Sequence, residues 1–174
     1  MLNRIILFFV FLGIFSASFA IGAEVKVSEE ESKIILEQFE SLIDEIDAIG
    51  IFSHNTTLAL PMFIPGFGIV WGAFAAFSTG MAFSVLKDAS PMLANVPSLT
   101  ILFMSPFGLM EVAAYSIAMS RSYMIVHKMI RRVPIRPDYR IIGIEIGILV
   151  GLLLVGGFVE YYFIENIPRD SPKI

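Results

Sequence analysis

The longest uncharged stretch of this chain constrains its fold more than any other feature. From Ile51 to Leu86 the sequence contains no Asp, Glu, Lys or Arg. A membrane-spanning helix needs about 20 predominantly apolar residues, so this stretch has room for nearly two spans. Its midpoint reads FIPGFG, residues 63–68, and a Pro-Gly pair of this kind interrupts a helix. We therefore predict a membrane hairpin over residues 52–87, with arms at about 52–64 and 67–87.

The composition agrees with an integral membrane protein. Hydrophobic residues make up 56% of the 174 residues and the mean hydropathy is +0.79, whereas soluble domains are nearer 45–50% apolar. The chain has no cysteine, and its two histidines, His54 and His127, lie far apart. Disulfides and cysteine nucleophiles are excluded. Two distant histidines also provide too few side chains for a typical histidine-based metal site or catalytic triad. We expect a protein that is not an enzyme, with no catalytic residues, metal, cofactor or nucleic-acid partner.

The two ends of the chain each supply one more apolar segment. Residues 1–23 carry Arg4 near their start, continue with an apolar run and end in small residues. This layout fits a cleavable signal peptide and equally a first transmembrane anchor, and the sequence leaves both open. Residues 141–164 predict the last span, and residues 166–174 a polar tail.

A further span is expected after the hairpin. Ser105-Pro106-Phe107-Gly108 interrupts the apolar run, and proline is favoured in the first turn of a helix. We predict a span over residues 106–127, preceded by a short interfacial or re-entrant segment, LTILFM. The predicted fold is thus an all-α polytopic membrane bundle, formed by the transmembrane domain 51–165 together with residues 1–23 if they are retained. It has about five spans, or four if residues 1–23 are cleaved, plus one external amphipathic helix.

Charge is distributed unevenly along the chain. Residues 24–50 carry nine acids and two lysines, whereas residues 121–140 carry six Lys or Arg and one acid, Asp138. Because basic loops stay in the cytoplasm, we predict that the loop 128–140 is cytoplasmic in a multi-pass plasma membrane protein. The acidic segment and the C-terminus are then outside. The chain must therefore cross the membrane an odd number of times between these two segments. A single span before residue 87 plus the span 106–127 would give two crossings, whereas the hairpin gives three. The charge pattern thus supports the hairpin independently of its length.

The acidic segment is expected to form one amphipathic helix over residues 28–49, ended by Gly50. Ser28 and Glu31 have the spacing of a capping box. Apolar residues recur at intervals of three and four, as in a coiled-coil seam. The helix can pack on its own membrane domain, bind a partner helix or a second copy, or lie on the bilayer. The predicted seam consists of Ile35, Phe39, Leu42, Ile46 and Ile49.

Glu111 is the strongest candidate for a functional residue. A carboxylate inside a membrane span costs roughly 2.5–3.5 kcal/mol on insertion scales, so it usually faces protein or water. On a helix, Tyr115, Ala118 and Ser122 share its face. If the helix begins at Pro106, Glu111 lies only ~7 Å along it. We interpret it as a structural hydrogen-bond anchor, with an ion or proton site as the alternative. We expect Arg121 to extend toward the inner surface.

The last span carries a second pattern. Gly143, Gly147 and Gly151 repeat every four residues, a spacing that lets helices approach closely. Packing inside the protein is our first interpretation, and contact with a second copy is the alternative. Glu145 points away from the glycines and is expected to pair with the basic loop. Glu160 lies near the outer end.

Two stretches of the sequence, FSHNTTLALPMFIPGFGIVWGAFAAFSTGMAFSVL and SPFGLMEVAAYSIAMSRS, resemble the stage II sporulation protein M family. In that family an Asn-led hairpin ends in Asn-Gly, and a Pro-His-Gly-x-x-Glu-Leu-x-Ala motif opens a later span. Thr79, Phe107 and Val112 depart from that pattern, which indicates a divergent member. The matching residues are Asn55, Gly80, Pro106, Gly108, Glu111 and Ala114.

The resemblance implies an integral envelope protein, and members in sporulating bacteria are similar to scaffolds that hold wall-remodelling enzymes. We therefore expect a scaffold or accessory subunit of a cell-envelope assembly. Its partners would be the lipid bilayer, other membrane or envelope proteins and a second copy of the chain. The alternative is a small transporter or channel component built around Glu111, because broken helices and a buried acid are typical of such sites.

Overall fold

The computed structural model describes residues 3–45, 47–91 and 93–166, with side chains 40–45 left out of the description. Within these residues every regular element is a helix. Three helices are long and apolar enough to cross a membrane: α1 (Arg4–Gly22), α4 (Phe67–Ala89) and α7 (Tyr139–Asn166). A fourth candidate is the pair formed by α5 (Ser98–Met104) and α6 (Pro106–Ile130), which bends by 90° between its two helices.

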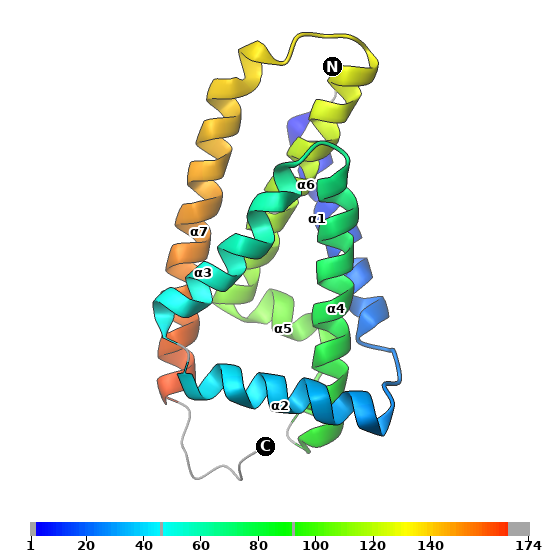
Figure 1. Cartoon of the computed structure of the whole chain (residues 1–174), viewed down its shortest axis with the longest axis vertical. Helices are drawn as coiled ribbons and strands as arrows, with labels where there is room; N and C mark the ends of the chain where they lie inside the picture. Colours follow the sequence, from blue (N-terminus) through cyan, green and yellow to red (C-terminus); the bar gives the residue numbers. More distant parts are fainter. Residues whose placement is uncertain (1–2, 46, 92, 167–174) are drawn as a thin grey trace.

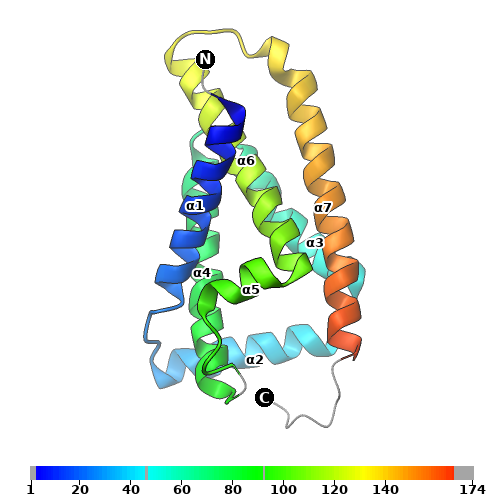
Figure 2. The same cartoon turned by 180° about the vertical axis from the view of Figure 1, so that it is seen from behind.

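The long helices run along the length of the molecule (Figures 1 and 2). The N-terminus and the turn between α6 and α7 lie at one end, while α2 (Glu29–Glu45) crosses the opposite end. The acidic helix and the basic turn are therefore at opposite ends of the bundle, which is the arrangement that the charge pattern requires. A short helix, η2 (Arg136–Asp138), precedes α7.

A hairpin forms where the Pro-Gly break predicts it. Its first arm is α3 (Ala48–Ala59) followed by the 3-10 turn η1 (Leu60–Phe63), and its second arm is α4. Gly66 has a φ of +77°, a conformation that glycine adopts without steric cost. The first arm is less regular than predicted: α3 has only 12 residues and is too short to span a bilayer alone.

The prediction of one helix over residues 28–49 is wrong. The helix α2 ends at Glu45 and α3 begins at Ala48, so Ile49 does not belong to the predicted seam. Asp47 causes the new start, since its carboxylate accepts a hydrogen bond from the Gly50 amide at 2.7 Å and caps α3. The capping box at the other end of α2 is present: the Glu31 amide donates to Ser28 Oγ at 3.3 Å.

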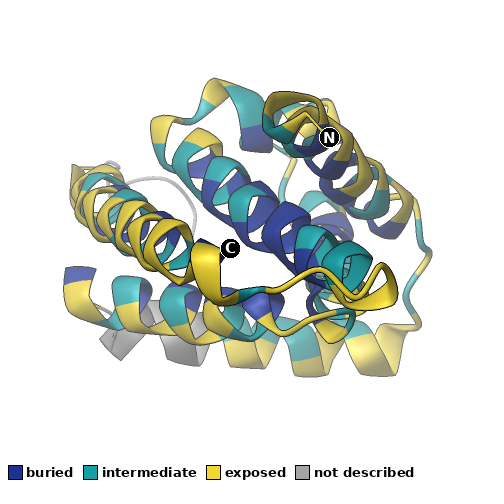
Figure 3. Cartoon of the chain, turned by 90° about the horizontal axis from the view of Figure 1, so that it is seen from above, coloured by how far each residue is buried: buried dark blue, intermediate teal, exposed yellow. Residues whose placement is uncertain are grey.

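Helix α1 is an integral part of the core. Phe11, Phe15 and Phe19 are buried, and the helix packs against α4 and α6. At Gly80 in α4 a Cβ atom would stand 2.1 Å from the Phe19 carbonyl oxygen, so only glycine permits this approach of the two helices. Figure 3 shows α6 as the most enclosed helix of the bundle, and it positions the polar side chains considered next.

Candidate functional site

Two groups of polar side chains lie along α6, inside the bundle. The first, which we name the acid cluster, contains Asn55 of α3, Glu111 of α6 and Glu160 of α7. The Asn55 side-chain amide donates to Glu111 Oε1 at 2.6 Å. The carboxyl group of Glu160 lies beside that of Glu111 and interacts with it. Three helices are thereby joined at one point, and Tyr115 is buried beside it with its ring against Phe15.

The second group, which we name the ion-pair cluster, contains Arg4 of α1, Arg121 of α6 and Glu145 of α7. Arg121 binds Glu145 through both Nε and Nη2, the latter at 2.7 Å from Oε1. Arg4 Nε donates to the same Oε1 at 2.8 Å. The Arg121 side chain is only 3% exposed and that of Glu145 is 11% exposed. Bidentate, charge-assisted pairing of this kind is strong because both partners are ionised and their geometry matches.

Arg4 makes two more contacts that tie α1 to α6. It donates to Ser120 Oγ and to the Ile117 carbonyl oxygen, the latter at 3.2 Å. The cluster therefore links the first, central and last long helices through one carboxylate. Two positive groups share this single negative group, which leaves a net positive charge in the cluster.

The sequence predictions for these charges need correction. Arg121 does not extend toward the surface, because Glu145 accepts its hydrogen bonds inside the bundle. Glu145 pairs with Arg4 and Arg121 and not with the basic loop. Sequence reasoning missed the part played by Arg4. A signal in the sequence was available for the other ion pair of this cluster. Arg121 and Glu145 are opposite charges within neighbouring apolar segments, and such residues usually pair.

Ser122 holds the tip of the hairpin. Its hydroxyl donates to the Ile64 carbonyl at 2.7 Å and accepts from the Gly66 amide at 3.0 Å. Ser122 is fully buried, so one side chain satisfies two backbone groups that the turn leaves unpaired. Tyr115, Ala118 and Ser122, predicted to share the face of Glu111, are all buried.

The remaining residues of the family resemblance have packing roles. Gly80 allows α1 and α4 to touch, as described above. Pro106 is the first residue of α6 and follows the N-cap residue Ser105. The Ser105 hydroxyl accepts a hydrogen bond from the Gly108 amide at 3.1 Å. A Cβ atom at Gly108 would stand 2.5 Å from Ser105 Oγ, so glycine is needed at this elbow. Phe107, the departure from the family motif, contacts Phe163 ring to ring.

The predicted seam of α2 is only partly described. Ile35 and Phe39 are half-buried, and the described part of the helix contacts α4. The side chains of Leu42 and Ile46 lie outside the described residues. Ile34 is 51% exposed, and Glu30, Lys33 and Glu37 are exposed around it. Within residues 29–39, the exposed surface of α2 is thus mainly charged, with Ile34 as its one exposed large apolar side chain.

The predicted internal packing of the α7 glycines is wrong. Gly143, Gly147 and Gly151 are exposed, and a Cβ atom at any of them would meet nothing within 4 Å. Glu145 does point away from them, into the bundle. Gly157, which sequence reasoning did not single out, is the close-packed one, because a Cβ atom there would stand 3.0 Å from the Ala48 carbonyl oxygen.

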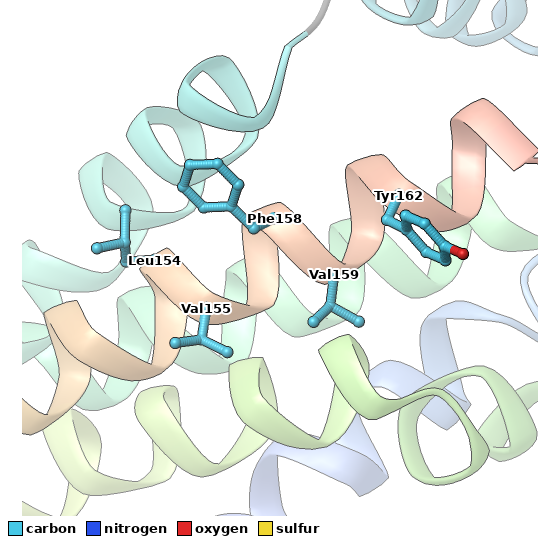
Figure 4. A pocket seen from close by; sticks show the side chains of 5 residues that line it. All are labelled: Leu154, Val155, Phe158, Val159 and Tyr162. Atoms are coloured by element: carbon cyan, nitrogen blue, oxygen red, sulfur yellow. The ribbon is translucent and has the colours of Figure 1, made fainter.

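Two apolar hollows open on the surface. One, of about 390 Å³, lies on α7 (Figure 4). The other, of about 310 Å³, lies at the elbow between α5 and α6. No residue of either polar cluster lines them, and the described residues contain no group of three acidic, His or Cys side chains able to hold a metal. The first hollow is lined by Leu154, Val155, Phe158, Val159 and Tyr162.

Comparison with protein families, curated proteins and solved structures finds no match for this chain. The fold and the two clusters define it as an all-helical protein with several apolar helices compatible with a membrane.

Proposed function

We propose that the protein is a non-enzymatic multi-pass scaffold or accessory subunit of a cell-envelope assembly, of the kind that its resemblance to the stage II sporulation protein M family implies. The proposal places α2 and the end of α7 outside and the basic turn in the cytoplasm. The crossings are α1, the two arms of the hairpin, α6 and α7, with α1 retained as an anchor.

The position of α2 carries this proposal. The helix lies across one end of the bundle (Figure 1), and Glu30, Lys33, Ile34 and Glu37 face away from it. The bundle behind is held by contacts that suit a rigid support: the ion-pair cluster, the acid cluster and the Ser122 cap on the hairpin. A charged helix on a rigid base is suited to docking a partner of opposite charge, since complementary charges steer association.

Affinity purification of the full chain in mild detergent, followed by mass spectrometry, tests this proposal. The test variant is Ile34→Lys/Glu37→Lys on α2, and the matched control is Asp88→Lys/Ala89→Lys at the end of α4. Both variants change the same charges at exposed positions on the same end of the molecule. We expect the α2 variant to lose partners that the control keeps. If both variants keep every partner, the docking role of α2 is wrong.

A second candidate function rests on the acid cluster. Two carboxyl groups that contact each other inside an apolar bundle are typical of proton or ion handling, so a small transporter or channel component is the rival proposal. Ion flux in proteoliposomes, measured for the unmodified chain and for Glu111→Gln, separates the two. Flux that the substitution abolishes would favour the rival over the scaffold, whereas no flux in the unmodified chain would remove it.

A further inference from the structure

The turn between α6 and α7 exposes a set of arginines that nothing in the bundle neutralises. Arg131, Arg132, Arg136 and Arg140 are all exposed. The one acid in the turn, Asp138, is buried and already bound to Lys128. Among the described residues, the only other acid toward this end of the molecule is Glu145, which is occupied by Arg4 and Arg121. Four guanidinium groups therefore lack an acidic partner within the described part of the chain.

Apolar side chains lie between these arginines. Ile130 is 77% exposed, Tyr139 is 65% exposed and Val133 is 45% exposed. They stand where the two helices end, so the same surface offers apolar contact and positive charge side by side. A soluble anion would use only the charges, whereas a phospholipid would use both, with its phosphate on the arginines and its acyl chains against the helix ends.

We propose that the turn 131–140 binds the headgroups of anionic phospholipids in the adjacent leaflet. Guanidinium groups suit phosphate because their planar donors match its oxygens. The site is independent of the docking surface on α2, which lies at the opposite end of the molecule. It adds a specific lipid class to the general requirement for a bilayer.

The backbone of the turn gives a sharp test variant. Arg132 has a φ of +54°, and the turn closes with the Val133 amide donating to the Lys128 carbonyl at 2.9 Å. This is the position after a helix end where glycine is preferred. Arg132→Gly therefore removes a charge and also relieves backbone strain, so a loss of lipid binding in this variant cannot be attributed to a weakened fold.

The experiment titrates the full chain, purified in an uncharged detergent, with phosphatidylglycerol or phosphatidylcholine and follows the thermal midpoint of unfolding. We expect phosphatidylglycerol to raise the midpoint and phosphatidylcholine to leave it unchanged. Arg132→Gly should weaken the apparent affinity for phosphatidylglycerol about fivefold, and each further Arg→Gln change in the turn by about the same factor. Its midpoint without lipid should be no lower than that of the unmodified chain.

Two controls keep the proposal open to refutation. Lys26→Gln/Lys87→Gln removes two positive charges at the opposite end and should leave lipid binding unchanged. Inorganic phosphate at the same concentration should not reproduce the effect of phosphatidylglycerol. Equal effects of the two lipids, unaltered affinity in Arg132→Gly, or a matching effect of inorganic phosphate would each overturn the proposal, the last by indicating a soluble-anion site.

Discussion

The two polar clusters on α6 connect helices of the bundle through different kinds of polar interaction. Both join α6 to α7 and to a third helix inside an apolar bundle. The ion-pair cluster does so with opposite charges, in which Glu145 accepts from Arg4 and Arg121. The acid cluster does so with like groups, in which Glu111 contacts Glu160 and Asn55. Polar residues inside an apolar bundle thus have more than one way to find hydrogen-bond partners.

The two clusters differ in whether a carboxyl group has to carry a proton. An ionised carboxylate has no donor, so two carboxyl groups can hydrogen-bond each other only when one of them carries a proton. The ion-pair cluster needs no such proton, because guanidinium groups supply every donor. The ion-pair cluster thus depends on opposite charges for its stability, whereas the acid cluster depends on hydrogen bonds to its carboxyl groups. Substitutions that remove charge while keeping hydrogen bonds should therefore affect the two clusters unequally.

The largest effect is expected from Glu145→Leu. The change leaves Arg4 and Arg121 without their common partner, and breaking a buried ion pair from one side costs about 3–5 kcal/mol. The free energy of unfolding, measured by titration with a denaturing detergent, reports the loss. The triple variant Arg4→Met/Arg121→Met/Glu145→Leu should recover most of it, because an apolar replacement of the whole group is often neutral. A triple variant as weak as the single one would contradict this account.

Ser122→Ala should have the next largest effect. The change leaves the buried Ile64 carbonyl and the Gly66 amide without their partner, which costs about 1–3 kcal/mol. Ser53→Ala at an exposed position of α3 is the matched control and should cost much less. The same unfolding titration measures both. Equal losses would show that the hairpin tip is held by other contacts.

Glu111→Gln should cost less than about 1 kcal/mol, because glutamine keeps a donor for Glu160 and an acceptor for Asn55. Glu145→Gln, the same chemical change in the ion-pair cluster, should cost considerably more, since it removes the only negative charge there. Comparing the two substitutions in one assay tests the distinction directly. If both cost the same, the clusters do not differ in the way proposed.

Gly147→Ala should have the smallest effect, within about 0.5 kcal/mol. Its Cβ atom would meet nothing within 4 Å, so the change leaves both clusters untouched. Unfolding titration and size-exclusion chromatography in detergent measure stability and oligomeric state together. A larger loss, or a change in oligomeric state, would mean that this glycine face packs against a second copy.

The sequence predicts the elements of the bundle better than their contacts. Pro65-Gly66 and Ser105-Pro106 locate the turns because their effects on the backbone are local. The break before α3 was missed although Asp47, a good capping residue, precedes it, because the amphipathic pattern continues through the break. Hydrophobic spacing alone does not end a helix.

The partners of the buried charges could not be predicted in the same way. Periodicity gives the face on which Arg121 or Glu145 lies, but not the rotation of each helix in the bundle. The ion pair between Arg4 and Glu145 joins residues from opposite ends of the chain, and only tertiary packing brings them together. The acid cluster was half predicted: Glu111 was identified as buried and polar, but Glu160 was assigned to the outer end without a partner.

The ion pair between Arg4 and Glu145 has a consequence for how the chain is made. Arg4 in α1 is synthesised well before Glu145, which is added only when α7 is made. Until then Arg4 and Arg121 lie within apolar segments without the Glu145 carboxylate that later binds them. A chain that stops before α7 would keep both arginines without the carboxylate that binds them. The ion pair between Arg4 and Glu145 also joins α1 to α7. Removing residues 1–23 as a signal peptide would therefore remove one of the two arginines that bind Glu145.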